Sequence, residues 1–143
     1  MATALLPALL LAALPAYVFP PVQSLADPAR PQPQIEARYT ALYRSCLAVP
    51  ALNTVSHDQC DAAEMARQDA ALNATWKATL AGLSPARIAE LRQAEREWIA
   101  ARKRHCDRAA KEGEGGTIAT LLYGQCMIDE TVRRTLWLER IAK

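Results

Sequence analysis

The cysteines are the residues of this chain whose chemistry is easiest to interpret from type and spacing. There are four of them: Cys46, Cys60, Cys106 and Cys126. An even set in a small exported domain is typical of a disulfide framework. The competing interpretation is a zinc site that also uses His57 and His105, but no CxxC or HxxxH pair presents two ligands at short spacing. The sequence therefore favours two disulfides and no metal.

Motifs for enzymatic chemistry are missing from the sequence. It contains no GxSxG, HExxH, Walker A or GxGxxG pattern. His57 lies near an expected helix start and His105 precedes a cysteine, so we interpret both as surface residues rather than as general acids or bases. We therefore expect a binding protein without a cofactor. A small hydrolase that uses Asp69 or Glu95 is the least favoured hypothesis.

The charge balance argues against nucleic-acid binding. The 143 residues include 17 Lys and Arg and 15 Asp and Glu, which gives a net charge of +2. Nucleic-acid binding needs clustered positive charge, because it is driven by the release of counterions from phosphates. We expect no nucleic-acid partner. A chain of this length has room for one domain with one core.

Charged residues also divide the chain into segments. None occurs in residues 1–26, which begin with a long apolar run and end with the small-x-small pattern of a signal-peptidase site. We predict that 1–26 is a signal peptide, with an uncleaved membrane anchor as the alternative. Alternating prolines then predict a linker at 27–34, before a folded domain at 35–143. The expected protein is periplasmic or secreted and has no membrane contact after signal cleavage.

The spacing of apolar residues predicts helices throughout the domain. Apolar positions recur at three- and four-residue intervals, and no segment alternates like a strand. The expected helices run from Ile35 to Cys46, from a capping box at Ser56 to near Gly82, from Ser84 to Gly113, and from Thr117 past Leu136. Short turns join the last three, so consecutive helices should lie antiparallel. The predicted fold is all-α, a small antiparallel bundle of about four helices.

This arrangement predicts how the cysteines pair. Cys106 and Cys126 lie at comparable distances from the turn at 113–116, because a helix rises about 1.5 Å per residue. A bridge between them closes that hairpin, and Cys46 then pairs with Cys60. Both closed loops are short, so each bridge should stabilise the fold by about 3 kcal/mol.

Two helices are predicted to point a charge into the core. A helical wheel places Asp69 in the middle of an apolar arc, and it places Arg102, with Glu95 beside it, on the apolar face of the next helix. Burial of either charge alone would cost several kcal/mol, so Asp69 and Arg102 should meet, with Asn73 filling the remaining hydrogen bonds. We interpret this buried polar cluster as structural, and a ligand or catalytic site is the alternative.

The last helix carries a second apolar group on the side opposite its main stripe: Trp137, Leu138 and Ile141. One neighbouring helix cannot cover both stripes. The favoured prediction is that this end of the helix is wedged between two helices, with the group packed against the first helix, which also needs an apolar surface to cover. The alternative is that the group is exposed and binds a partner.

Residues along the whole domain resemble a known family. The resemblance is carried by Cys60-x3-Glu64-x4-Asp69-x2-Leu72-Asn73, by Leu91-x2-Ala94-x3-Trp98-x3-Arg102-x3-Cys106, and by Gly116, Cys126, Thr131 and Arg134. Over about residues 39–138 the chain resembles the LprI-like lysozyme inhibitors, a family of small exported helical domains. It departs from their pattern at Trp76, where they usually have Tyr, and at Glu95, where they usually have Gln.

The resemblance implies an exported bacterial protein that inhibits c-type lysozyme by occluding its cleft. Such lysozymes are generally strongly basic, and a net charge of +2 gives no overall attraction to them. The acidic turn at 112–116 is the local feature that suits a basic cleft, through Glu112 and Glu114, and a plain helix–helix turn is the alternative. A second hypothesis is an interaction module of the cell envelope that binds another protein through the second apolar group.

Overall fold

The structure describes residues 33–142, and every regular element in that part of the chain is a helix. In this computed structural model the helices are α1 (Pro33–Glu36), α2 (Ala41–Leu47), α3 (Thr54–Ala81), α4 (Pro85–Glu112) and α5 (Gly116–Ile141). The last three are long, with 28, 28 and 26 residues. The predicted all-α class is confirmed. The expected bundle of about four helices is instead three long helices preceded by two short ones.

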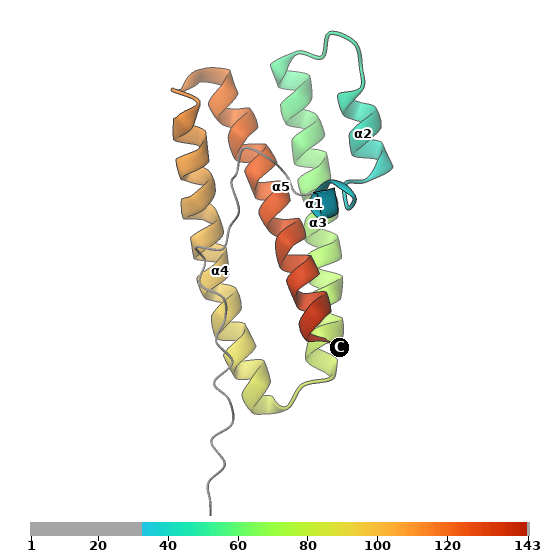
Figure 1. Cartoon of the computed structure of the whole chain (residues 1–143), viewed down its shortest axis with the longest axis vertical. Coiled ribbons are helices and arrows are strands. Elements are labelled where there is room, and N and C mark those ends of the chain that lie inside the picture. Colours follow the sequence, from blue (N-terminus) through green and yellow to red (C-terminus); the bar gives the residue numbers. More distant parts are fainter. Residues whose placement is uncertain (1–32, 143) are drawn as a thin grey trace, which may run out of the picture.

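The long helices lie side by side with α5 between α3 and α4 (Figure 1). Short turns after α3 and α4 reverse the chain, so α4 runs antiparallel to α3 and to α5. The helices α3 and α5 therefore run in the same direction. The short α2 packs beside the first half of α3. The α2–α3 loop and the α4–α5 turn therefore lie at one end of the domain, and the α3–α4 turn lies at the other.

The ends of α4 are those that the sequence predicts. Ser84 precedes the helix, and its Oγ accepts a hydrogen bond from the backbone N–H of Arg87 at 3.4 Å. Pro85 is the first helical residue, a position at which proline loses no intrahelical hydrogen bond. Gly113 follows the last helical residue. Local capping chemistry thus sets both ends of this helix.

The starts of α3 and α5 differ from the prediction. Asn53 rather than Ser56 caps α3, since its Oδ1 accepts a hydrogen bond from the Ser56 backbone N–H at 2.9 Å. The predicted cap at Ser56 is therefore wrong by three residues, and asparagine is as good a cap as serine. At α5, Gly115 occupies the cap position without a side-chain hydrogen bond, and Thr117 lies inside the helix.

The predicted first helix at 35–46 is interrupted at Thr40. The Thr40 backbone is extended, with φ −70° and ψ 154°, and its Oγ1 accepts a hydrogen bond from the Tyr43 N–H at 3.2 Å. Its own backbone N–H donates to Glu64 of α3 at 2.9 Å. A contact between distant parts of the chain therefore sets this break, and the apolar spacing of the segment cannot reveal it.

The predicted domain boundary shifts by two residues. Pro33 and Gln34, expected at the end of the linker, belong to α1. The predicted signal peptide at 1–26 and the rest of the linker lie outside the described residues. Within the described part of the chain, no helix combines the length and the apolar character that a membrane span requires.

The core consists of three groups of buried side chains along α5. They are Tyr43, Cys60 and Ile128; Leu72, Leu91 and Leu138; and Cys106, Ala109 and Cys126. Each group includes a residue of α5, because this helix has neighbours on both sides. Between Cys126 and Leu138, α5 buries polar as well as apolar residues.

The second apolar group of α5 packs between the other two long helices. Leu138 is fully buried with Leu72 of α3 and Leu91 of α4, and Trp137 and Ile141 pack against the same cluster. The prediction that this group covers the first helix is wrong. The alternative of an exposed partner site is also wrong, because Leu138 has no accessible surface. A helix that lies between two others has two buried faces, which accounts for its two apolar stripes.

Both predicted disulfides are present in the structure. The Cα atoms are 5.9 Å apart in Cys46–Cys60 and 5.5 Å apart in Cys106–Cys126. Cys60 lies near the start of α3 and Cys106 near the end of α4. The bridges therefore brace the end of the domain that carries the α2–α3 loop and the α4–α5 turn.

Candidate functional site

The predicted buried polar cluster is divided between two places. Arg102 Nη1 lies 3.8 Å from Asp69 Oδ1, but the Asp69 side chain is 49% exposed, and Asn73 is exposed as well. Arg102 also donates to Thr131 Oγ1 of α5 at 2.8 Å and lies over the Trp98 ring, 4.6 Å from its centroid. Asp69 and Arg102 do meet, as predicted, but the expected burial of Asp69 and Asn73 is wrong. Since α5 separates α3 from α4, the inward charge of α4 meets α5 instead of a buried residue of α3.

Glu95, the remaining member of that predicted cluster, pairs with Arg134 of α5. Arg134 Nε donates to Glu95 Oε2 at 2.8 Å, and Nη2 of the same guanidinium lies 2.7 Å from that oxygen. Both side chains are largely buried, and the guanidinium lies 4.0 Å from the centre of the Trp137 ring. Burial lowers the pKa of Arg134, and the charge of Glu95 opposes that shift. The pair links α4 to α5, so Glu95 is not free to act as a hydrolase residue.

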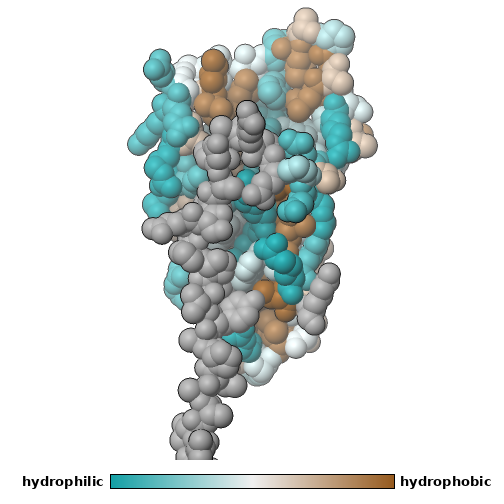
Figure 2. Space-filling view, in the orientation of Figure 1, coloured by the Kyte–Doolittle hydropathy of each residue, from teal (hydrophilic) through white to brown (hydrophobic). Residues whose placement is uncertain are grey.

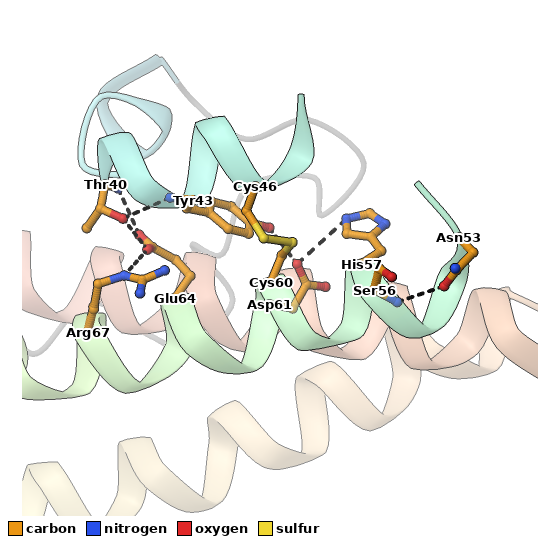
Figure 3. The surroundings of a disulfide bond; sticks show 10 residues. All are labelled: Thr40, Tyr43, Cys46, Asn53, Ser56, His57, Cys60, Asp61, Glu64 and Arg67. Atoms are coloured by element: carbon orange, nitrogen blue, oxygen red, sulfur yellow. Dashed lines mark hydrogen bonds and ion pairs between the residues drawn. A yellow bond between two sulfur atoms is a disulfide. The ribbon is translucent and has the colours of Figure 1, made fainter. Parts of the chain in front are cut away.

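A second polar cluster, which the sequence reasoning missed, lies where α2 packs on α3 (Figure 3). The fully buried Glu64 accepts hydrogen bonds from the backbone N–H and the hydroxyl of Thr40, at 2.9 and 2.6 Å. Gln68 Nε2 and Arg67 Nε also donate to it, at 2.7 and 2.9 Å. Burial alone raises the pKa of Glu64, but these hydrogen bonds outweigh it and hold the pKa below its usual value. Glu64 therefore acts as an ionised anchor for the start of α2.

Two tyrosines extend this cluster toward α5. Tyr43 Oη donates to Asp61 Oδ1 at 2.7 Å, and Tyr39 Oη donates to Asp129. Gln125 Nε2 donates to both Tyr39 Oη and Asp129 Oδ1, at 2.7 and 3.0 Å. Burial is the largest cause of the raised pKa of both tyrosines and of both carboxyl groups. These groups bond to one another inside the domain, which indicates a structural role.

One signal in the sequence points to this cluster. Cys60 and Glu64 are four residues apart and share a helix face, so a buried disulfide at Cys60 indicates that Glu64 also points inward. Gly124 marks the place where α5 crosses that face. A Cβ atom at 124 would lie 2.9 Å from Asp61 Oδ2, so a larger residue would force the Asp61 side chain to shift.

The acidic turn at 112–116 is exposed at the end of the domain that the disulfides brace. Glu114 has φ +52° and Gly115 has φ +87°, both in the left-handed region. This conformation costs a non-glycine residue about 1 kcal/mol, and residues held in it often belong to binding sites. Both carboxylates of the turn, Glu112 and Glu114, face solvent. The turn therefore presents negative charge on a defined backbone.

Comparison with known proteins relates this geometry to a family. The family model described as lysozyme inhibitor LprI matches residues 46–138. The chain belongs to the LprI lysozyme inhibitor family. The matched region contains all four cysteines, both members of the Glu95–Arg134 pair and the acidic turn. No curated protein and no solved structure gives a significant match to the chain.

The histidines of this LprI-family domain are not placed to share a metal ion. His57 Nε2 lies 3.6 Å from Asp61 Oδ1 on α3, and His105 Nε2 of α4 lies 4.0 Å from Glu130 Oε1 of α5. Over residues 33–142, no three His, Cys, Asp or Glu side chains are grouped so that they could bind one ion. The four cysteines are all in disulfides.

Glu130 is the buried carboxyl group of the LprI-family domain whose pKa is most strongly raised. Its Oε1 lies 3.3 Å from Arg133 Nε, and the side chain is 4% exposed. The pKa of Glu130 is raised to about 7, chiefly by burial and further by Asp129, against the opposing charges of Arg133 and Arg102. The neutral form is thus favoured in the folded state at acidic pH.

We expect Glu130 to make the stability of the domain depend on pH. The folded state holds this proton more tightly than the unfolded chain, so the stabilisation is complete below the unfolded pKa of 4.5 and is lost as the pH rises to about 7. A Glu130→Gln variant should therefore match the parent near pH 4 and be more stable by about 2–3 kcal/mol near pH 8. Urea denaturation at both pH values measures this difference. A constant difference between the two proteins would contradict it.

Proposed function

We propose that this LprI-family domain inhibits a c-type lysozyme by placing the acidic turn in the substrate cleft. Family membership supports a lysozyme inhibitor, and lysozymes of this type are generally strongly basic. The observation that carries the proposal is an exposed turn with two carboxylates, Glu112 and Glu114, at the tip of the α4–α5 hairpin. A negative tip is attracted to a basic cleft, and its presence there excludes the substrate.

The hairpin holds this turn in one shape before any partner binds. Cys106–Cys126 ties the two helices together behind the turn. Gly113 packs so closely that a Cβ atom there would lie 3.1 Å from both the Ala119 backbone nitrogen and the Leu122 side chain. A segment that is ordered in advance loses less conformational entropy on binding. This supports inhibition by insertion of a rigid turn.

We also propose that the protein acts outside the cytoplasm, after removal of a signal peptide at 1–26. Two disulfides and a lysozyme inhibitor family are typical of an extracellular or periplasmic protein. Inhibition by occlusion of a cleft needs no cofactor and no catalytic residue, which agrees with a family of inhibitors rather than enzymes.

Neutralising the acidic turn should weaken inhibition of lysozyme. In a Glu112→Gln/Glu114→Gln variant we expect the inhibition constant for a purified c-type lysozyme to rise by about five- to tenfold at low salt, because two attractive charges are lost. The dependence of inhibition on salt should become flatter. The melting temperature should not change, since both side chains are exposed. A lysozyme turnover assay across a salt series measures the first two effects.

A matched control is available on the same helix. Glu90 and Glu97 are exposed carboxylates of α4 away from the turn, and Glu90→Gln/Glu97→Gln removes the same charge. This control should inhibit like the parent. If both double variants lose inhibition of lysozyme equally, then overall charge, and not the turn, governs binding. A parent that does not inhibit would favour the alternative, an interaction module of the cell envelope with another protein partner.

A further inference from the structure

Lysine and arginine are missing from the two segments that form one end of the domain. The chain has 17 such residues, yet none lies between Arg44 and Arg67 or between Lys111 and Arg133. The exposed charged residues of these segments are all acidic: Asp58, Glu112 and Glu114. A surface built from both segments therefore carries negative charge only.

The two segments meet at the same end because α3 and α5 run in the same direction (Figure 1). Gly124 of α5 is in contact with Asp61 of α3, so these residues lie at one level of the bundle. The first residues of the two helices, Thr54 and Gly116, are similarly far from that level, by about 10–12 Å at 1.5 Å per residue. The α2–α3 loop and the acidic turn therefore lie at the same level, at one end of the domain.

Large apolar side chains are exposed at the same end. Around the α2–α3 loop they are Leu42, Val49 and Val55, which are 67%, 53% and 69% exposed, and on α5 they are Ile118 and Leu122, 59% and 38% exposed. Figure 2 shows hydrophobic residues gathered at this end, over the α2–α3 region and over the first turns of α5. Among the described residues, Ile99 in the middle of α4 is the other large hydrophobic side chain exposed to this degree. Exposed apolar side chains concentrated in one place are typical of protein interfaces.

The outer face of α4 limits this surface on one side. Arg104, Arg108 and Lys111 are exposed at spacings that place them on one face of the helix. They would repel a basic protein, whereas the side formed by the α2–α3 loop and the first turns of α3 and α5 would attract it. The charge pattern thus directs a basic partner to one side of the acidic turn.

The α2–α3 loop is held in one shape, as the acidic turn is. Cys46–Cys60 closes the loop, with a separation of 14 residues between the two cysteines. Ala51 within it has φ +55°, a left-handed conformation that is unfavourable for alanine. Both turns at this end thus contain one strained non-glycine residue behind a disulfide, a combination found at preorganised binding sites.

We infer that the α2–α3 loop region provides a second contact surface for the basic protein that takes the acidic turn. We call it the loop surface and define it by Val49, Val55 and Asp58. The inference rests on the proposed function and extends it from one turn to two contacts at the same end of the domain. Val49 and Val55 supply the apolar part of this contact, and Asp58 supplies negative charge that suits a basic partner.

A pair of charge variants tests this inference. Val49→Lys/Val55→Lys and Val49→Glu/Val55→Glu remove the same apolar surface and introduce opposite charges. For a purified c-type lysozyme, the lysine pair should raise the Kd at least about tenfold relative to the glutamate pair, and the ratio should shrink as salt is added. Both proteins should unfold at a similar urea concentration, because the parent side chains are exposed. Ile99→Lys and Ile99→Glu, made in α4, should bind with equal Kd.

Each outcome distinguishes the inference from the proposed function. If the parent inhibits lysozyme and the two charge pairs bind it equally, the loop surface is not a contact and the proposed function stands. If the parent does not bind lysozyme, both fail. If the lysine pair turns a dimer into a monomer in sedimentation without changing the Kd, the surface is covered by a second copy of the chain, and the inference is overturned.

Discussion

Glu95→Ala is expected to lower the free energy of unfolding by about 3–5 kcal/mol, because it leaves the Arg134 guanidinium buried without a counter-charge. Arg134 is 8% exposed and lies between the Trp98 and Trp137 rings, so water cannot replace the lost carboxylate. The hydrogen bond from Arg134 Nε and the ion-pair contact from Nη2 would both be lost. Urea denaturation of parent and variant at neutral pH measures the difference.

Two further variants separate the charge from the packing at this site. Glu95→Gln keeps an oxygen that accepts from Arg134 and should lose about half as much stability as Glu95→Ala. The double change Glu95→Leu/Arg134→Met replaces the ion pair with apolar side chains of similar volume, and it should recover much of the loss. If Glu95→Ala unfolds at the same urea concentration as the parent, the pair is solvated in solution and the assignment is wrong.

Glu64→Ala should lower the free energy of unfolding by a similar amount, about 3–5 kcal/mol, but it should loosen a different part of the domain. This carboxylate accepts four hydrogen bonds, two of them from Thr40 at the start of α2. Its removal leaves the Thr40 N–H without its acceptor, and the Gln68 amide keeps only the backbone oxygen of Arg38. We expect α2 to lose its protection against amide hydrogen exchange, while α4 and α5 keep theirs. Cys46–Cys60 still tethers α2 in the variant, so the helix loosens without leaving the domain.

The pH response of Glu64 has the opposite sign to that of Glu130. The pKa of Glu64 is lowered in the folded state. The stability that its carboxylate contributes is therefore present at neutral pH and is lost as the pH falls below the usual pKa of 4.5 and through the lower pKa of the folded state. The difference in stability between parent and Glu64→Gln should therefore shrink with acidification. Glu97→Ala, an exposed change on α4, is the control and should alter stability by less than about 0.5 kcal/mol at either pH. A Glu64→Ala variant that behaves like this control would contradict the buried anchor.

Features that depend on nearby residues were predictable in this chain. Ser84, Pro85 and Gly113 set the ends of α4 through hydrogen bonds to residues within one turn. The pairing of Cys106 with Cys126 follows from counting residues along two helices from a shared turn. The exposure of the acidic turn was also predictable, because a short connection between antiparallel helices lies at the surface.

Features that depend on which helices face each other were not predictable. A helical wheel shows that Asp69 and Arg102 each lie on the apolar side of a helix, but it does not show which helix that side meets. Arg102 faces Thr131, and Glu95 faces Arg134, because α5 lies between α3 and α4. The break at Thr40 likewise depends on Glu64, which is 24 residues away along the chain.

The sequence by itself determined the helical class, the cysteine pairs, both ends of α4 and the position of the acidic turn, and its motifs identified the family. The tertiary structure alone decided that α5 is the central helix, that Glu64 and Glu95 are the buried carboxylates with structural partners, and that two cation-free segments share one end. The physical reason is range. Capping and helix periodicity act over a few residues and are written in the local sequence, whereas the partner of a buried charge is set by the packing of helices that are distant in the chain.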